Sequence, residues 1–153
     1  MICLTGDIHH QGLNTGNQQH SDRSEIQTAL DFLELLAFYK VKMTLFISGK
    51  TFQESPQATA AIARHELVEI GGHNWDCFEP SLWHRFWNKA PGSYNGPRWY
   101  QRWDVEKTKR TIEAVTQTPL RCWRNHMYMH GPYTEQVLAE AGIAICSDGV
   151  KKA

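Results

Sequence analysis

The sequence predicts a single α/β domain with a parallel sheet over residues 1–153, and two features of the chain carry this prediction. Short apolar segments that favour β-structure alternate with segments whose apolar residues recur at helical spacing. Strands that alternate with helices pair in parallel through right-handed crossovers. We therefore expect the order β-α-β-α-β, then a long irregular segment, then α-β-α-β.

Five short segments are predicted to be buried strands, because each is rich in apolar and β-branched residues. They are residues 1–6, 41–49, 67–72, 120–123 and 143–146. Between the first two strands, residues 11–23 have no periodicity and are predicted to be a polar loop. Residues 73–103 are rich in aromatic side chains, contain Pro-Gly and Asn-Gly pairs, and are predicted to be poorly regular.

Four helices are predicted from their capping residues and apolar spacing. The first runs from Ser24, which begins a capping-box pattern, to about residue 39. The second opens at Ser55-Pro56 and runs to about residue 64, because Pro is favoured at the first helical position. The third is expected to begin with Asp104 as its N-cap, and the fourth runs over 132–141 and stops at Gly142.

Composition excludes several classes of protein. The 16 basic and 16 acidic residues balance, so we expect no nucleic-acid partner and no anionic membrane partner. The four cysteines show no CxxC spacing and no density typical of a secreted disulfide scaffold, which favours a reducing, cytoplasmic setting. No segment resembles a signal peptide or approaches the ~20 apolar residues of a membrane span.

Polar side chains follow three of the predicted strands at their carboxyl ends. In parallel α/β proteins, ligands bind at this edge of the sheet. These side chains are Asp7, His9 and His10 after the first, His73, Asn74, Asp76 and Cys77 after the third, and Arg124, Asn125 and His126 after the fourth. Taken singly, such an Asp is usually a turn residue and such a Cys a buried apolar one. Their convergence at one edge predicts a functional site.

These segments resemble the polysaccharide deacetylase family in order and spacing. They are TGD at 5–7, TLFISG at 44–49, EIGGHNWDC at 69–77 and CWRNHMY at 122–128. The resemblance implies a distorted (β/α) barrel, of which about five of seven βα units are present in this chain. It also implies a hydrolase that removes N-acetyl groups from sugars with a divalent metal, usually zinc.

The resemblance assigns roles position by position. It implies that Asp7 is the general base, that Arg124 orients it, and that His73 is the first metal-binding histidine. Cys77 stands where the family has a second metal-binding histidine, and Ile8 stands where it has a metal-binding aspartate. Two of the three expected ligands therefore differ in this chain.

Three interpretations of the altered ligands remain open at this point. His9, His73 and Cys77 could rebuild a zinc site, since His9 lies on the same side of an extended chain as Asp7. Alternatively, Asp7 is itself a ligand. A third interpretation is metal-free hydrolysis, as in the allantoinase-like relatives that act on cyclic amides. His126 is expected to stabilise the oxyanion or to protonate the leaving amine, and His130 is a second candidate acid.

The expected partner is a small-molecule or oligosaccharide substrate, most simply an N-acetylated sugar or small amide. Aromatic residues such as Trp83, Trp99 and Trp103 could form a stacking wall for it, or could instead hold a long loop in place. The family barrel continues beyond the fifth strand, so either the chain is part of a longer protein or a second copy completes the sheet edge. The rival functions are a catalytically lapsed binding module and a structural zinc domain.

Overall fold

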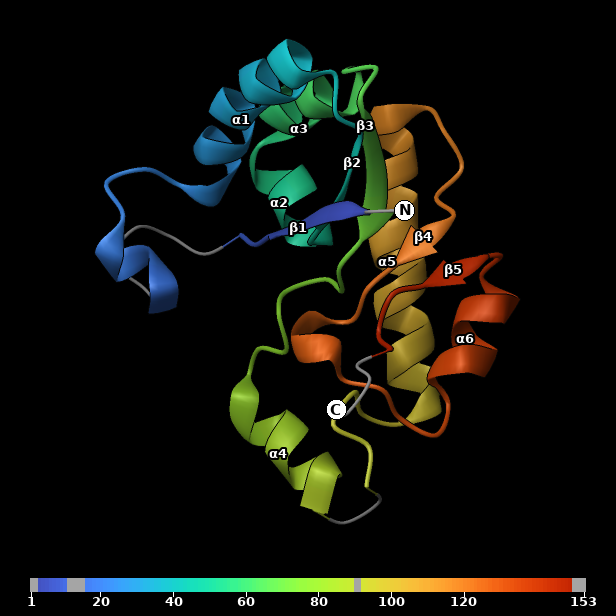
Figure 1. Ribbon diagram of the computed structural model, residues 1–153. Helices are drawn as coiled ribbons and strands as arrows, with labels where there is room; N and C mark the ends of the chain where they lie inside the picture. Colours follow the sequence, from blue (N-terminus) through green and yellow to red (C-terminus); the bar gives the residue numbers. More distant parts are fainter. Residues whose placement is uncertain (1–2, 11–15, 90–91, 150–153) are drawn as a thin grey trace.

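The computed structural model describes residues 3–10, 16–89 and 92–149 of the chain. Its centre is a parallel five-stranded sheet in the order β1-β2-β3-β4-β5, shown in Figure 1. The strands are β1 (Leu4–Ile8), β2 (Met43–Ile47), β3 (Val68–Gly72), β4 (Cys122–Trp123) and β5 (Ile145–Cys146). Neighbours in space follow one another in sequence, which is the winding of a (β/α) barrel. The predicted α/β class is confirmed.

Helices connect the strands and pack beside one another. They are α1 (Glu25–Tyr39), α2 (Gly49–Glu54), α3 (Pro56–Ala63), α4 (Ser81–Lys89), α5 (Arg98–Thr116) and α6 (Thr134–Glu140), with short 3-10 helices η1 (Gly16–His20) and η2 (His126–Tyr128). Helix α3 packs against both α1 and α5, and α5 in turn packs against α6. No helix in the described part of the chain is long and apolar enough to cross a membrane.

Capping residues fix several of the helix ends that the sequence predicts. The side chain of Ser24 accepts a hydrogen bond from the Gln27 backbone N–H and begins α1. Ser48 caps α2 in the same way through the Thr51 N–H, and Pro56 occupies the first turn of α3. Gly142, with φ +76°, follows the end of α6 in the left-handed conformation that glycine favours.

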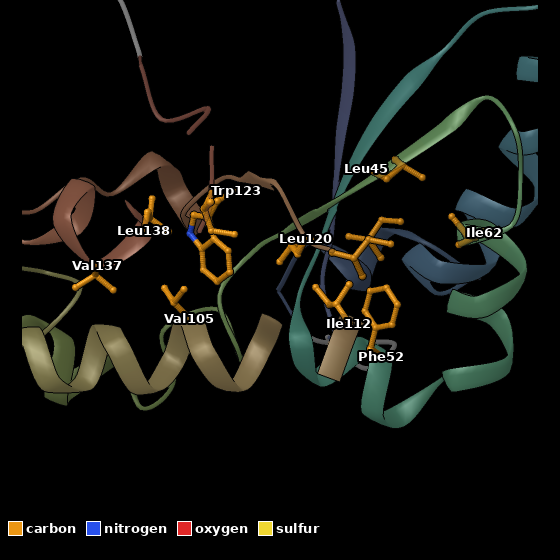
Figure 2. Close-up of a cluster of buried hydrophobic side chains, with 12 residues drawn as sticks. Leu45, Phe52, Ile62, Val105, Ile112, Leu120, Trp123, Val137 and Leu138 are labelled. Atoms are coloured by element: carbon orange, nitrogen blue, oxygen red, sulfur yellow. The ribbon is translucent and has the colours of Figure 1, made fainter. Parts of the chain in front are cut away.

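The hydrophobic core lies between the sheet and the helices, as Figure 2 shows. Ile8, Leu45 and Ile47 contribute to it from the strands, and Ile112 and Val137 from α5 and α6. Burying this apolar surface is the main favourable term in folding, at roughly 25 cal/mol per Å². Ile8 is only 3% exposed, so its side chain belongs to this core and not to the opposite face of the sheet.

Two glycines at the end of β3 allow large rings to approach the strand. A Cβ on Gly71 would lie 2.4 Å from the ring of Phe46, and a Cβ on Gly72 would lie 2.4 Å from the ring of Trp123. Any side chain at these positions would displace one ring or the other. The Gly-Gly pair is therefore required for packing immediately before His73.

The segment 73–103 is more regular than predicted. It contains α4 and the first turns of α5, which begins at Arg98 after Pro97. The prediction that Asp104 is an N-cap is therefore wrong, because Asp104 lies inside α5 and is buried. The short helix α2 was also missed, since six residues between a strand and Pro56 give no measurable periodicity.

Candidate active site and metal centre

Three histidine rings converge where β1, β3 and β4 end. The Nε2 atom of His9 lies 3.2 Å from Nε2 of His73 and 3.1 Å from Nδ1 of His126. The His73 and His126 nitrogens are 3.3 Å apart. Nitrogen ligands of tetrahedral zinc, at bond lengths near 2.0–2.1 Å, are separated by roughly 3.3 Å. The triangle of ring nitrogens therefore has the dimensions of three zinc ligands.

The remaining ring nitrogens of two of these histidines are held by acceptors. Nδ1 of His9 lies 2.9 Å from the carboxylate of Glu25, and Nδ1 of His73 lies 2.8 Å from the backbone carbonyl of Arg124. A proton on each Nδ1 leaves the lone pair of Nε2 free to face the partner rings. Metal-binding histidines in proteins are oriented by acceptors of this kind.

Glu25 is itself fixed in place at the first turn of α1. Its carboxylate accepts hydrogen bonds from the His9 backbone N–H at 2.6 Å and from Nε2 of Gln18 at 2.7 Å. Burial alone would raise the pKa of Glu25, but the hydrogen bonds from His9 and Gln18 lower it below its usual value. Glu25 is therefore a carboxylate at neutral pH and can accept the His9 proton.

Two of the rings are neutral at physiological pH. Burial, reinforced by the neighbouring histidines, lowers the pKa of His73 to about 3. The same causes lower the pKa of His126 to about 4. Neutral imidazole is the form that binds metal, so protons compete weakly for these two nitrogens at neutral pH.

Cys77 lies beside the histidines, as its position after β3 predicts. Its Sγ is within 4.8 Å of the ligand nitrogens of His9 and His126, and 3.8 Å from Nδ1 of His10. Burial raises the pKa of the Cys77 thiol well above its usual range. Asn74, Cys77 and Phe78 all have positive φ, an uncommon backbone conformation for such residues that clusters at functional sites.

Asp7 and Arg124 form the ion pair that the resemblance implies. Nη1 of Arg124 donates to Oδ1 of Asp7 at 2.8 Å, and Nη2 donates to the hydroxyls of Thr5 at 3.1 Å and Ser147 at 2.8 Å. The guanidinium also lies over the ring of Phe46, 4.2 Å from its centroid. Arg124 is therefore held on several sides, and Asp7 is held by Arg124.

A buried polar network supports the loops that carry His73 and His126. Oδ1 of Asn74 accepts from the His126 backbone N–H at 2.7 Å. Nδ2 of Asn74 donates to Asp104 at 2.8 Å and to Asn125 at 3.2 Å. Asp104 also accepts from the Trp75 backbone N–H at 2.8 Å. Asp104 on α5 thus links the two histidine-bearing loops through one amide side chain.

Within the predicted ligand set, the structure brings His9 close to His73 and to Cys77, and it adds His126, which was expected to act on the oxyanion or as an acid. His130 lies elsewhere, near Glu135 and Asp148. Sequence reasoning missed Glu25 and Asp104, since neither follows a strand. Asn74 was among the polar residues expected after the third strand, but its role in linking the two loops was not predicted.

An aromatic groove borders the site. It is lined by Asp76, Glu79, Pro80, Trp83, Trp99, Tyr100 and Trp103. Trp99 is 67% exposed and Trp103 is 43% exposed, whereas Trp83 packs on Tyr100 with ring centroids 4.3 Å apart. Some of the predicted aromatic residues therefore hold the segment together, and others present open ring faces. Asp76, one of the residues that line the groove, immediately precedes Cys77 in the sequence.

Solved structures of carbohydrate esterases share this fold. A carbohydrate esterase family 4 pseudoenzyme from Bacillus anthracis matches with a TM-score of 0.66 and 18% identity, covering 94% of this chain and 42% of its own. A putative polysaccharide deacetylase from Mycobacterium smegmatis has a TM-score of 0.67 and 21% identity, covering 92% and 48%. A family 4 carbohydrate esterase from Streptomyces lividans, in complex with acetate, has a TM-score of 0.65 and 14% identity, covering 94% and 60%.

The chain thus spans about half the length of these structures. No curated protein matches its sequence. The sequence model of the polysaccharide deacetylase family matches residues 22–146, most of the chain. With the parallel sheet in sequential order and a site at the strand ends, this match shows that the chain belongs to the polysaccharide deacetylase family.

Proposed function

We propose that the chain is a metal-dependent hydrolase of carbon–nitrogen bonds other than peptide bonds, most simply a deacetylase of an N-acetylated sugar or a small amide. The observation that carries the proposal is the triangle of ring nitrogens from His9, His73 and His126, with sides of 3.1–3.3 Å. Family membership supports the reaction class.

The residues fit a zinc ion. His9, His73 and His126 would hold it, and the Cys77 Sγ lies within 4.8 Å of the ligand nitrogens of His9 and His126. Imidazole and thiolate are ligands that zinc accepts readily. Zinc bound there supplies Lewis-acid chemistry, because it lowers the pKa of water and polarises an amide carbonyl. His126 is thus reassigned in this proposal from the oxyanion to the metal.

Asp7 would act as the general base that accepts a proton from the attacking water. A base must be ionised and correctly oriented before the reaction begins. The Arg124 guanidinium provides the orientation, since it donates to Asp7 and is itself anchored by Thr5 and Ser147. Asp7 and His9 lie on the same side of an extended chain, which places the base on the side of the metal ligands.

The aromatic groove supports a carbohydrate substrate. Exposed rings such as Trp99 and Trp103 can stack on the apolar face of a pyranose, and Asp76 and Glu79 can accept hydrogen bonds from its hydroxyls. Asp76, one of the groove residues, directly precedes Cys77 in the chain. A substrate of two or more sugar units could therefore place one unit at the histidines and the next on the aromatic rings.

The test is acetate release from N-acetylated chitooligosaccharides by zinc-loaded protein. We expect wild type to release acetate, Asp7→Asn to keep its zinc and lose 10²–10⁴-fold in rate, and His73→Ala to lose activity together with the zinc ion bound between the three histidines. Cys3→Ser, at an exposed position away from the site, is the matched control and should behave as wild type. Zinc binding without Asp7-dependent acetate release would overturn the deacetylase proposal.

A catalytically lapsed carbohydrate-binding module is the second candidate. Ile8, buried in the core where the family has a metal-binding aspartate, favours it. In that case, tryptophan fluorescence would report oligosaccharide binding, and no acetate would be released. A metal-independent hydrolase of cyclic amides is the remaining alternative, and it would keep its activity after treatment with a chelator.

A further inference from the structure

A second cluster of metal-ligand side chains lies apart from the three converging histidines. Its members are His130, Cys146 and Asp148, whose ligand atoms all lie within 4.8 Å of one another. Cys146 ends β5, Asp148 follows it by two residues, and His130 comes from the loop before α6. Two strand-end loops thus bring a thiol, a carboxylate and an imidazole to one point.

The spacing of this cluster is compatible with a shared ion. Nδ1 of His130 lies 3.6 Å from Oδ2 of Asp148, which is too far for a hydrogen bond. Sγ of Cys146 lies 3.2 Å from the same oxygen. Ligand atoms of a tetrahedral zinc with bonds of 2.0–2.3 Å are separated by roughly 3.3–3.6 Å. Both distances fall near this range.

The charge balance also favours a cation. The Asp148 side chain is only 3% exposed, and in the described part of the chain His130 is its one ionic neighbour. A buried carboxylate is costly unless it is paired with positive charge. The backbone N–H and Nδ2 of Asn125 donate to its two oxygens at 2.7 and 2.5 Å, which fixes the carboxylate group without adding positive charge.

Exposure gives an ion access to the cluster. The His130 side chain is 41% exposed and Cys146 is exposed, so an ion can enter from solvent and keep water as its fourth ligand. Burial, and then the neighbouring Asp148, raise the pKa of the Cys146 thiol to about 12. Without a cation the thiol therefore stays protonated and donates to Asp148, and a bound metal would release that proton.

We propose that His130, Cys146 and Asp148 form a second zinc site with a structural role. The site fixes Asp148, which fixes Asn125, and Asn125 directly precedes His126 in the first cluster. Between His126 and His130, Met127 and Tyr128 both have positive φ, a strained conformation at non-glycine residues. An ion at each end of this segment would hold the strained turn in place.

The test is the number of zinc ions that the full chain binds, measured by metal analysis after dialysis against buffered zinc. We expect two per chain in wild type and one in His130→Ala and in Cys146→Ser. The matched controls are His20→Ala and Cys3→Ser, at exposed positions outside both clusters, which should bind two. Near-ultraviolet circular dichroism confirms that each variant is folded.

Cobalt provides a second readout of the same site. Thiolate-to-cobalt absorption should weaken in Cys146→Ser and keep its full intensity in Cys3→Ser. Two zinc ions in both His130→Ala and Cys146→Ser, with unchanged cobalt absorption, would overturn the proposal. If only the cluster of His9, His73 and His126 fails to bind zinc, the result is different, because wild type would then bind one zinc ion and Cys146→Ser none.

Discussion

Asp7, Ile8 and His9 show how the alternation of a strand decides which side chain can reach the site. Successive residues of a strand point to opposite faces. Ile8 packs in the core with Leu45 and Ile47, whereas Asp7 pairs with Arg124 and His9 joins the histidine cluster. Ile8 therefore contributes no ligand to the proposed metal site, and the next residue, His9, points toward it instead.

Restoring the family residue at this position should damage the protein. Ile8→Asp places a carboxylate in the core, so we expect the free energy of unfolding to fall by about 4 kcal/mol or more, with no gain in zinc affinity. Ile8→Val, the matched control, should lose about 1 kcal/mol. Urea titration and zinc binding check both. Tighter zinc binding by a folded Ile8→Asp protein would show that the site does use this position.

The sequence identified this site because polar residues after parallel strands meet at one edge. That rule predicts that His9, His73 and Cys77 meet, and the structure places His9 close to each of the other two. This rule could not decide whether His126 is a metal ligand or a group that stabilises the oxyanion, because the His126 ring reaches the other two histidines only through the turn at 126–128. It could not find Glu25, whose role depends on how α1 begins beside β1.

Arg124 offers a test of the base. In Arg124→Lys a single ammonium replaces the guanidinium, which donates to Asp7, Thr5 and Ser147, so most of these hydrogen bonds are lost. We expect a fall of ten- to a hundredfold in the rate of acetate release with unchanged zinc content. Arg124→Met leaves the Asp7 carboxylate unpaired and should cost about 3 kcal/mol of stability in urea unfolding. Full activity in Arg124→Lys would contradict the positioning role.

At the level of elements, α5 supports the site from behind. Asp104 lies inside α5 and accepts hydrogen bonds from Asn74 and from the Trp75 backbone. The sequence prediction was wrong here because an Asp before an apolar helical pattern is usually the N-cap of that helix. The earlier start at Pro97-Arg98 lies in a segment rich in aromatic residues that shows no clear helical pattern. Only the packed structure shows that this Asp serves the loop after β3.

Asp104→Asn should be destabilising in a pH-dependent way. Burial raises the pKa of Asp104 to about 7 in the folded protein, against the hydrogen bonds from Asn74 and Trp75. The folded state therefore favours the protonated carboxyl, a contribution fully present below the unfolded pKa near 4 and lost as pH rises through 7. Asn cannot titrate, so the stability difference between wild type and variant should be larger at pH 5 than at pH 7.5.

At pH 7.5 we expect a loss of about 1–3 kcal/mol in Asp104→Asn, because one buried amide N–H loses its acceptor. Histidines such as His73 are present in both proteins, so their contributions to the pH dependence of stability cancel in the comparison. Chemical unfolding at the two pH values measures the difference. An equal loss at both would mean that Asp104 is ionised throughout this range.

The end of α1 offers a stabilising change. Lys40 ends this helix in the left-handed conformation, with φ 53° and ψ 41°. This conformation costs about 1–2 kcal/mol for a residue with a Cβ and little for glycine. Lys40→Gly should therefore raise the free energy of unfolding by about 0.5–1 kcal/mol, measured by urea titration. Lys42→Gly, just beyond the cap, is the control and should show no gain.

Across the whole molecule, the histidine cluster joins strands that are distant in sequence. His9, His73 and His126 follow β1, β3 and β4, and β2 lies between the first two in the sheet. The sequential sheet order was predictable from the alternation of strands and helices. The contacts between loops separated by more than 50 residues were not, because they depend on how the finished sheet aligns its strand ends.

Zinc should stabilise the whole fold, because it binds a site that exists only when these strands are assembled. A ligand at 100 times its dissociation constant adds about 2.7 kcal/mol per site. We expect the midpoint of thermal unfolding to rise with zinc and to fall again with a chelator. His73→Ala should respond less than wild type, and the Cys3→Ser control should respond equally.

Anomalous diffraction from crystals of the zinc-loaded protein would show directly whether three imidazoles bind the metal in place of the ligands expected from the family. We predict a zinc peak about 2.0–2.1 Å from Nε2 of His9, Nε2 of His73 and Nδ1 of His126. Crystals grown in zinc that show no ion between these three rings, or an ion held by other groups in its place, would contradict this prediction.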